Sequence, residues 1–346
     1  MTLKVGVVRD TRYLEHKPGL VHPEAPGRLR SVYRMLDREF SDRLVQIEPK
    51  LATLEQLQTA HSPKYIDLIM STAEKDFTPL SSDTFVSAKS YMAAWLAAGA
   101  GISAVDALMN GEVQACFSLV RPPGHHALAD RAGGFCIFNN VGIAAKHAID
   151  RYGLERILII DWDVHHGNAL QELFYRDCKV FYFSSHYMGW YPNTGTWDET
   201  GEDAGAGYTV NIPVPKDLED DDIIHLYQNV LNPIVRKYKP QLIMIAAGFD
   251  AHERDPLGRT HLTEKAYRAL TQIILQMSET GNGAPLFFSL EGGYDSRALS
   301  ESIREVLDML TFTGRRERLS TKTTMRAEEM LRKVKKTHSK HRVWTY

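Results

Sequence analysis

The stretch RILIIDWDVHHGN, residues 156–168, joins an apolar run directly to carboxylate, imidazole and amide side chains. Ile157–Ile160 is apolar at every position, which is typical of a strand buried on both faces of a parallel sheet. On the extended segment that follows, alternate side chains share a face, so Asp161, Asp163 and His165 point the same way. Converging carboxylates and an imidazole repel or desolvate one another unless a cation or strong donors lie among them. The stretch therefore predicts a metal site at the end of a buried strand.

Similar apolar runs recur along the chain and alternate with helical patterns. Strands are expected at residues 3–8, 43–48, 115–120, 156–161, 179–184, 208–213, 241–246 and 285–290. Helices are expected over residues 90–110, 141–152, 221–238, 263–280 and 295–310, where apolar residues recur every three or four positions. This alternation predicts a single-domain α/β fold, with about eight mostly parallel strands and helices on both faces of the sheet. Long polar loops are expected at residues 12–28 and 186–207, and loops of this length are often functional.

Polar residues also follow four other predicted strands. They are RPPGHH at 121–126, SH at 185–186, AGFDAH at 247–252 and EGGYD at 291–295. Ligands of open parallel sheets bind at the carboxyl ends of the strands, so we expect these residues at one edge. A catalytic zinc site needs three protein ligands and an open position, and Asp250 is the natural third ligand beside Asp163 and His165. Such oxygen and nitrogen ligands fit Zn²⁺, Fe²⁺ or Mn²⁺. The alternative to a metal site is that these side chains only form hydrogen bonds at the ends of the strands.

The tandem histidines His125 and His126 follow a rigid Arg-Pro-Pro-Gly turn. Zinc lowers the pKa of its bound water to about 7, and a neighbouring imidazole can accept the proton and later deliver it to a leaving amine. Each imidazole needs a partner at its other nitrogen, and Asp161 and Asn168 are available. The histidine backed by the amide should have the less elevated pKa and be the better base. Tyr294 can donate a hydrogen bond to the oxyanion that forms when water attacks an amide carbonyl. The alternative is that the two histidines and the tyrosine only pack against neighbouring side chains and have no catalytic role.

In this order and at these separations, RPPGHH, GGFCIFNN at 133–140, DWDVHHGN, GFDAH and EGGYD closely resemble the zinc-dependent histone deacetylase and acetylpolyamine amidohydrolase superfamily. The resemblance extends from the HPE-containing segment at 22–29 to about Leu310. Trp162, Asn168 and EGGY resemble the class II deacetylases and their bacterial relatives. An arginase-like fold is implied. The implied metal ligands are Asp163, His165 and Asp250.

The resemblance implies catalytic roles for four residues, and Asn168 completes the expected catalytic set. His126 would be the general base and acid, and His125 its electrostatic partner, paired with Asp161. Tyr294 would be the oxyanion donor. Asn168 stands where class I enzymes usually carry an aspartate.

The resemblance also implies structural potassium ions (K⁺) and an acyl-lysine tunnel. One K⁺ is expected near the backbone of Asp161, Asp163 and His165, with help from Ser184 and Ser185. A second is expected near Phe174, Asp177, Val180 and Tyr208. The tunnel would be lined by Gly134, Phe135 and Tyr191, because aromatic walls clasp a methylene stem and exclude water without adding charge. Asp83 is either a rim residue that holds the substrate backbone or the N-cap of a helix beginning near Val86.

The resemblance implies that the substrate is an acetylated lysine peptide or protein, or an acetylated polyamine. Leu257 follows Asp255–Pro256, where a polyamine-selective relative carries a glutamate, and this favours acyl-lysine. Glu15, Glu24 and Asp83 could still supply a charge for a polyamine. Two other functions are less consistent with the sequence. A dinuclear manganese ureohydrolase would require more carboxylates at the site, and Asp255 is the only obvious extra one near the strand end. A non-catalytic acyl-lysine binding protein would be expected to have lost a metal ligand or Tyr294, and neither is lost.

The charge of the 346-residue chain is unevenly spread. Residues 313–346 carry eleven Lys or Arg against three Glu, a net charge of +8, whereas the whole chain has −2. We expect a catalytic domain at 1–312 and a basic tail that is helical and packed on the acidic body, rather than an arm for nucleic acid or another partner. Three cysteines without a CxxC pair predict a reducing compartment. The first residues lack the features of a signal peptide, and the apolar residues 91–105 are too few to span a bilayer and are expected to form a buried helix. We therefore expect a cytoplasmic protein that is not associated with a membrane.

Overall fold

Eight parallel strands form the central sheet of the computed structural model, which describes residues 3–316, 319 and 322–344. The strands are β1 (Val5–Val8), β2 (Val45–Gln46), β5 (Ala115–Ser118), β6 (Ile157–Asp161), β7 (Val180–Tyr187), β8 (Thr209–Val214), β9 (Leu242–Ala247) and β10 (Leu286–Leu290). Their order is β2-β1-β5-β10-β9-β6-β7-β8, and each neighbouring pair is parallel. Each overlaps one predicted strand, so the predicted fold class is confirmed.

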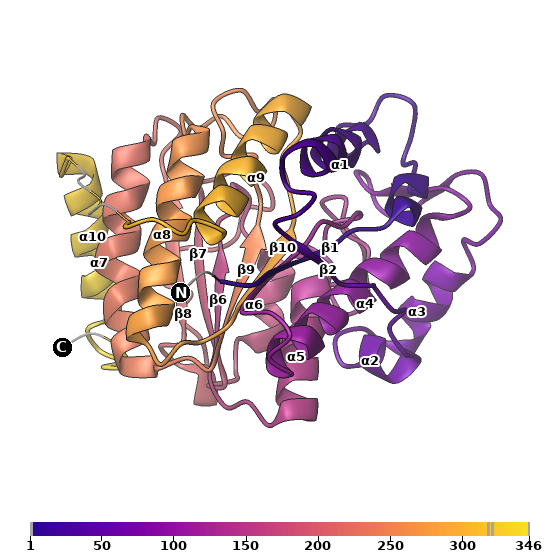
Figure 1. Cartoon of the computed structure of the whole chain (residues 1–346). Helices are drawn as coiled ribbons and strands as arrows, with labels where there is room; N and C mark the ends of the chain where they lie inside the picture. Colours follow the sequence, from indigo (N-terminus) through magenta and orange to yellow (C-terminus); the bar gives the residue numbers. More distant parts are fainter. Residues whose placement is uncertain (1–2, 317–318, 320–321, 345–346) are drawn as a thin grey trace.

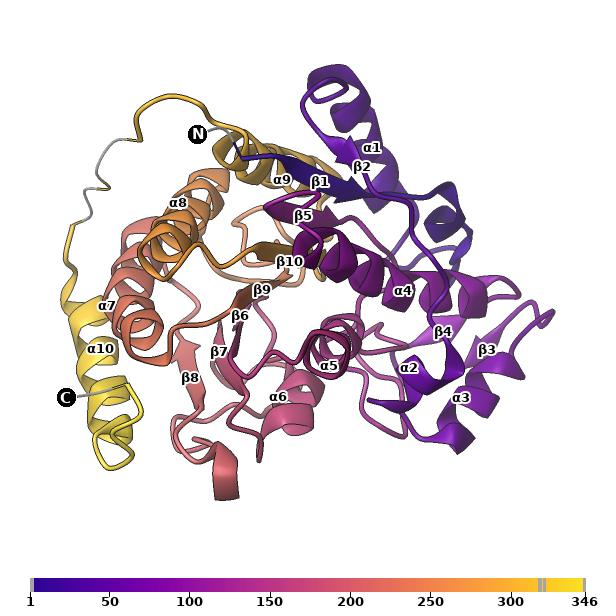
Figure 2. The same cartoon turned by 60° about the horizontal axis from the view of Figure 1, so that its bottom comes forward.

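Helices cover both faces of this sheet, as Figure 2 shows. On one face lie α7 (Asp220–Tyr238), α8 (Glu264–Thr280) and α9 (Ser296–Leu310), with α1 (Gly27–Glu39) beside α9. On the other face lie α4 (Ser90–Met109), α5 (Asn140–Tyr152) and α6 (Asn168–Phe174). The five predicted helices are present, with ends within one residue of those expected. The tail contributes α10 (Met325–His338), which packs outside α7 (Figure 1).

Short elements complete the structure. η1 (Thr11–Glu15) and η2 (Asp203–Gly205) overlap the two segments that were expected to be long loops, residues 12–28 and 186–207. Between residues 49 and 89, where no element had been predicted, the structure has α2 (Leu54–Gln58), α3 (Pro63–Met70) and a hairpin of β3 (Thr78–Pro79) and β4 (Phe85–Val86). The N-cap alternative for Asp83 is wrong, because α4 begins at Ser90 after Lys89. Asp83 instead lies in the β3–β4 turn, where its Oδ1 accepts hydrogen bonds from the hydroxyls of Ser81 and Thr84.

Helix α4 is apolar because it is a core element. It is long and apolar enough to cross a membrane by length and composition alone, but 78% of its apolar window is buried inside the fold. It packs against β5 and α5, and the backbone of Lys50 approaches it so closely that a Cβ at Gly99 would lie 1.7 Å from the Lys50 carbonyl oxygen. The expectation of a buried helix over residues 91–105 is confirmed.

Candidate active site

Four adjacent strands in the middle of the sheet, β5, β10, β9 and β6, end at the same edge. The segments that follow them carry His125 and His126, Tyr294, Asp250, and Asp163, respectively. Residues from distant parts of the chain therefore meet at the carboxyl ends of the strands, where parallel sheets bind their ligands.

The three predicted metal ligands form one buried cluster. Ligand atoms of Asp163, His165 and Asp250 all lie within 4.8 Å of one another. His165 Nδ1 is 3.1 Å from Asp163 Oδ1 and 3.0 Å from Asp250 Oδ2. Glycines leave the space that the carboxylates occupy, because a Cβ at Gly248 would lie 2.0 Å from Asp163 Oδ2, and one at Gly292 would lie 2.0 Å from Asp250 Oδ2. The Gly292 N–H also donates to Asp163 Oδ2 at 2.8 Å.

The charges of this cluster fit a divalent cation. Burial lowers the pKa of His165, but Asp250 and Asp163 outweigh burial and raise it to about 10. Burial and the neighbouring Asp163 raise the pKa of Asp250. The two carboxylates thus hold a proton on His165, and a divalent cation would replace that proton. Two carboxylate oxygens and one imidazole nitrogen, without thiolate, are a donor set that suits Zn²⁺ or Fe²⁺.

The tandem histidines differ in charge because their partners differ. His125 Nδ1 is 3.1 Å from Asp161 Oδ2, whereas His126 Nδ1 is 2.8 Å from Asn168 Oδ1. Burial lowers the pKa of His125, but Asp161 and Asp163 raise it to about 10. Burial, then the charges of His125 and His165, hold the pKa of His126 well below its usual value. The pairing is the one that the resemblance implies, and it leaves His126 neutral beside a charged His125.

Asp255 and Arg28 fix the position of Tyr294 through contacts with the backbone and with the ring. Its N–H donates to Asp255 Oδ2 at 2.5 Å, and the Arg28 guanidinium lies 4.8 Å from the centre of its ring. Arg28 Nε donates to the Gly293 carbonyl at 2.6 Å and its Nη1 to Glu24 Oε1 at 2.9 Å. Burial raises the pKa of Tyr294 well above its usual value, which the Arg28 charge only partly offsets. The phenol therefore keeps its proton and can donate it in a hydrogen bond.

A cavity of about 200 Å³ leads to these groups. It is lined by Asp83, His126, Gly134, Phe135, His165, Trp190, Tyr191, Leu257 and Tyr294. The predicted tunnel residues are thus brought together. Gly134 has φ +55°, and a Cβ there would lie 2.2 Å from His126 Cδ2, so only glycine fits between the tunnel wall and this imidazole. Asp83 holds the same wall, because its Oδ1 accepts the Gly134 N–H at 3.1 Å.

Comparison with known proteins places this geometry in a family. Residues 22–310 match the model of the histone deacetylase domain. The chain belongs to the histone deacetylase family. The predicted class of enzyme, an amidohydrolase of the deacetylase type, is thereby confirmed at the level of the family.

Relatives of this deacetylase-family chain come from archaea, plants and animals. It is 38% identical over 292 residues to a probable deacetylase of Archaeoglobus fulgidus, covering 84% of this chain and 81% of that protein. It is 37% identical over 333 residues to histone deacetylase 15 of Arabidopsis thaliana, covering 93% of this chain and 59% of that protein. For the human polyamine deacetylase HDAC10 the identity is 36%, over 81% of this chain and 43% of that protein. The crystal structure of the HDA15 HD domain superposes with a TM-score of 0.90 at 34% identity, covering 97% of this chain and 96% of that one.

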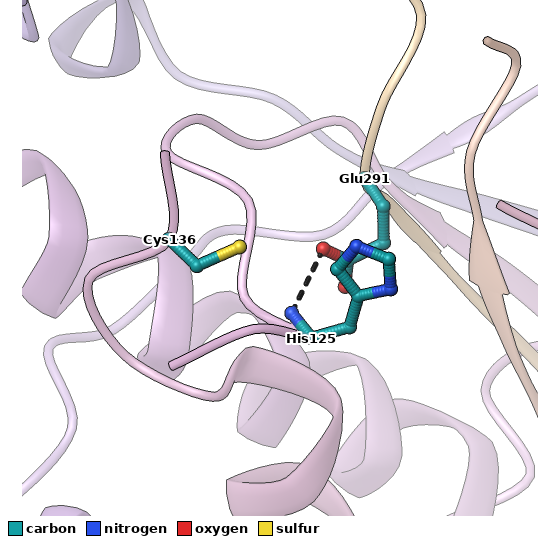
Figure 3. A group of neighbouring side chains, drawn as sticks. All are labelled: His125, Cys136 and Glu291. Carbon is teal, nitrogen blue, oxygen red and sulfur yellow. Dashed lines mark hydrogen bonds between the residues drawn. The ribbon is translucent and has the colours of Figure 1, made fainter. Parts of the chain in front are cut away.

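In this deacetylase-family fold, His125 also belongs to a second buried group of possible ligands, together with Cys136 and Glu291 (Figure 3). Glu291 Oε2 accepts the backbone N–H groups of His125 at 3.1 Å and Gly124 at 2.6 Å. The Cys136 thiol donates to the Gly134 carbonyl at 3.4 Å, and burial raises its pKa well above the usual value. A neutral thiol is a poor metal ligand, and the contacts of Glu291 instead brace the turn that carries His125.

The residues expected around K⁺ gather at two places, but their polar groups already have partners. The Ser184 hydroxyl lies 2.9 Å from His186 Nδ1, and the Ser185 hydroxyl lies 2.9 Å from the hydroxyl of Tyr227. At the second place the Phe174 carbonyl accepts the Asp177 N–H, the Asp177 carbonyl accepts the Val180 N–H, and the Tyr208 carbonyl accepts the Tyr182 N–H. A carbonyl has a second lone pair, so coordination is compatible with these bonds. Both potassium sites stay predictions.

Sequence reasoning missed four contributors to the site. Arg28 and Glu291 lie inside quoted motifs. Glu291 directly follows the apolar strand β10, and a charge at that position was a signal that could have been followed, whereas Arg28 is the second residue of α1. Asp255 was noted only as an extra carboxylate, whereas it holds the backbone of Tyr294. Trp190 lies in a polar loop without any local pattern, and only the folded chain brings it to the cavity.

Proposed function

We propose that this chain is a zinc-dependent deacetylase that hydrolyses the acyl amide of acylated lysine in peptides or proteins. The observation that carries the proposal is the cavity of about 200 Å³, because the metal-ligand candidate His165 and the catalytic candidates His126 and Tyr294 all line it. Zn²⁺ would be held by Asp163, His165 and Asp250, and Fe²⁺ suits the same ligands.

The chemistry divides between the ion and the chain. When bound, the ion would polarise the acyl carbonyl and lower the pKa of water. Neutral His126, whose Nδ1 contacts Asn168, has Nε2 free to accept a proton from the attacking water. As the water oxygen bonds to the acyl carbon and the carbon–nitrogen bond breaks, His126 returns this proton to the leaving amine. The Tyr294 hydroxyl donates a hydrogen bond to the oxyanion in between.

The walls of the cavity support lysine as the amine. Phe135, Trp190, Tyr191 and Leu257 offer aromatic and apolar surface, which suits a four-methylene stem. Asp83 is the one carboxylate of the lining, and both of its oxygens accept the Gly134 N–H, at 3.1 and 3.2 Å. A polyamine carries a second positive charge, and in this described lining Asp83 is the only carboxylate that could attract it. Similarity to the human polyamine deacetylase nevertheless makes acetylpolyamines the second candidate.

Turnover of acetyl-lysine peptides, acetylputrescine and acetylspermidine tests the proposal. We expect the peptides to be preferred, chelation to abolish activity, and Zn²⁺ or Fe²⁺ to restore it. Activity that survives verified removal of metal would contradict the mechanism. Preference for acetylspermidine would favour the second candidate, and acyl-lysine binding without turnover would indicate a binding protein. In a Leu257→Glu variant the ratio of kcat/KM values should move toward acetylspermidine, whereas Leu257→Met should leave it unchanged.

A further inference from the structure

The outer face of α10 carries basic side chains that its docking leaves unused. The helix packs on α7 through Ala327, Met330, Leu331 and Val334, which are all buried. Figure 2 shows α10 as the outermost helix on this flank of the molecule. Its apolar face is therefore covered, and its opposite face points to solvent.

The ion pairs that attach α10 lie at its first turn. Arg326 pairs with Asp217 at 2.6 Å and with Asp222 at 3.3 Å. Glu328 pairs with His225 at 3.1 Å. Within residues 322–344, as far as the structure describes them, these are the ion pairs of the tail. In this described range, docking thus uses one basic side chain, Arg326, in ion pairs, and a second, Lys333, lies 4.6 Å from the centre of the Trp197 ring.

Five of the remaining cations form a group that we call the basic face. It consists of Arg332, Lys335, Lys336, Lys340 and Arg342, which are all exposed. In the described part of the chain, none of these five side chains has an acidic group within ion-pair distance.

The end of α7 extends this basic face. Lys237 Nζ donates to the Arg342 carbonyl at 2.5 Å, so the ends of α7 and α10 lie together. Arg236 and Lys239 are exposed there. Since the first turns of the two helices also meet, through Arg326 and Asp222, the helices run in the same direction. Helix α7 begins beyond the carboxyl end of β8 and ends before the start of β9, so its last turn lies at the edge of the sheet opposite the catalytic cavity. The basic face, which adjoins this last turn, lies toward the same edge. A partner bound there leaves the cavity open.

Although the sequence favoured a docked helix over an arm for nucleic acid, we propose that the basic face of this docked helix binds duplex nucleic acid through its phosphate backbone. A duplex carries about one negative charge per 1.7 Å of axis, which a row of cations can neutralise with release of counterions. An anionic membrane is the less suitable partner, because interfacial helices insert a free apolar face and that of α10 is buried. The proposal is independent of the catalytic function, since no residue of the basic face lines the cavity.

Binding of a labelled 20-base-pair duplex DNA over a series of salt concentrations tests this proposal. The variant Arg332→Ala/Lys336→Ala/Lys340→Ala removes three cations of the basic face. The matched control Lys64→Ala/Lys75→Ala/Lys265→Ala removes three exposed cations elsewhere. If all three cations of the face contact phosphates, the slope of log K against log salt should become shallower by about 2.7. At 0.1 M salt we expect at least a tenfold loss of affinity, with little change in the control.

Other arms of the experiment separate the possible partners. Duplex RNA should bind with similar salt dependence, because the contacts are to phosphates. Thermal melting should agree between the parent and both variants, which excludes loss of folding as the cause. The proposal is overturned if the control weakens DNA binding as much as the α10 variant, or if no duplex binds at 0.05 M salt. It is also overturned if vesicles containing phosphatidylserine, and not duplexes, bind through the basic face.

Discussion

Replacing Asn168 with aspartate puts a carboxylate where an amide oxygen now lies 2.8 Å from His126 Nδ1. The new charge would stand roughly 4 Å from the centre of the imidazolium, which at an effective dielectric constant near 20 is worth about 4 kcal/mol. Since 1.36 kcal/mol corresponds to one pKa unit, the pKa of His126 should rise by about 2–3 units. Asn168 is the first residue of α6, where a carboxylate is favoured by the helix dipole, so the fold should tolerate the change.

The sign of the effect follows from the role of His126. A general base must be neutral, and in the parent protein burial and the charges of His125 and His165 hold its pKa well below the usual value. With the aspartate, His126 is protonated up to higher pH, so the acid limb of the kcat/KM profile should move upward by about 2–3 units. The profile is measured from pH 5 to 10 with an acetyl-lysine peptide. Asn168→Ala, which adds no charge, should lower the rate without this shift. An unmoved acid limb in a folded, metal-replete aspartate variant would refute the reasoning.

Three further outcomes are expected. Tyr294→Phe keeps the ring but loses the oxyanion donor, so kcat should fall about 10²–10³-fold, whereas an unchanged kcat would remove the hydroxyl from the mechanism. Gly134→Ala places a Cβ 2.2 Å from His126 Cδ2 at a φ of +55°, and we expect at least a tenfold lower kcat/KM and a lower Tm, with parent-like values as the contrary result. In the metal-free protein the pKa values of His125 and His165 are raised from 6.5 to about 10. Their stabilisation is complete below pH 6.5 and is lost toward pH 10, so Tm should fall between pH 7 and 9.5; a calorimetric Tm that does not fall would contradict these charges.

Local patterns in the sequence were enough to predict the eight strands and five helices of the core. Apolar runs and helical periodicity depend on neighbours along the chain, and they agree with the structure to within a few residues. The pair Asp163 and His165 was predicted in the same way, because residues two apart share a face on an extended chain. Assigning Asp250 as the third ligand already required the expectation that several strands end at one edge.

Only the tertiary structure decided which distant residues meet. The order β5-β10-β9-β6 brings the tandem histidines, Tyr294, Asp250 and Asp163 together, and strand order depends on the packing of the whole sheet. The same holds for Arg28, which reaches the backbone of Gly293, 265 residues away. The charge of each histidine depends on burial and on a partner more than 35 residues distant, so no local pattern contains it. The sequence therefore determined which groups could hold a metal ion, and the fold decided their distances, their protonation and the shape of the cavity above them.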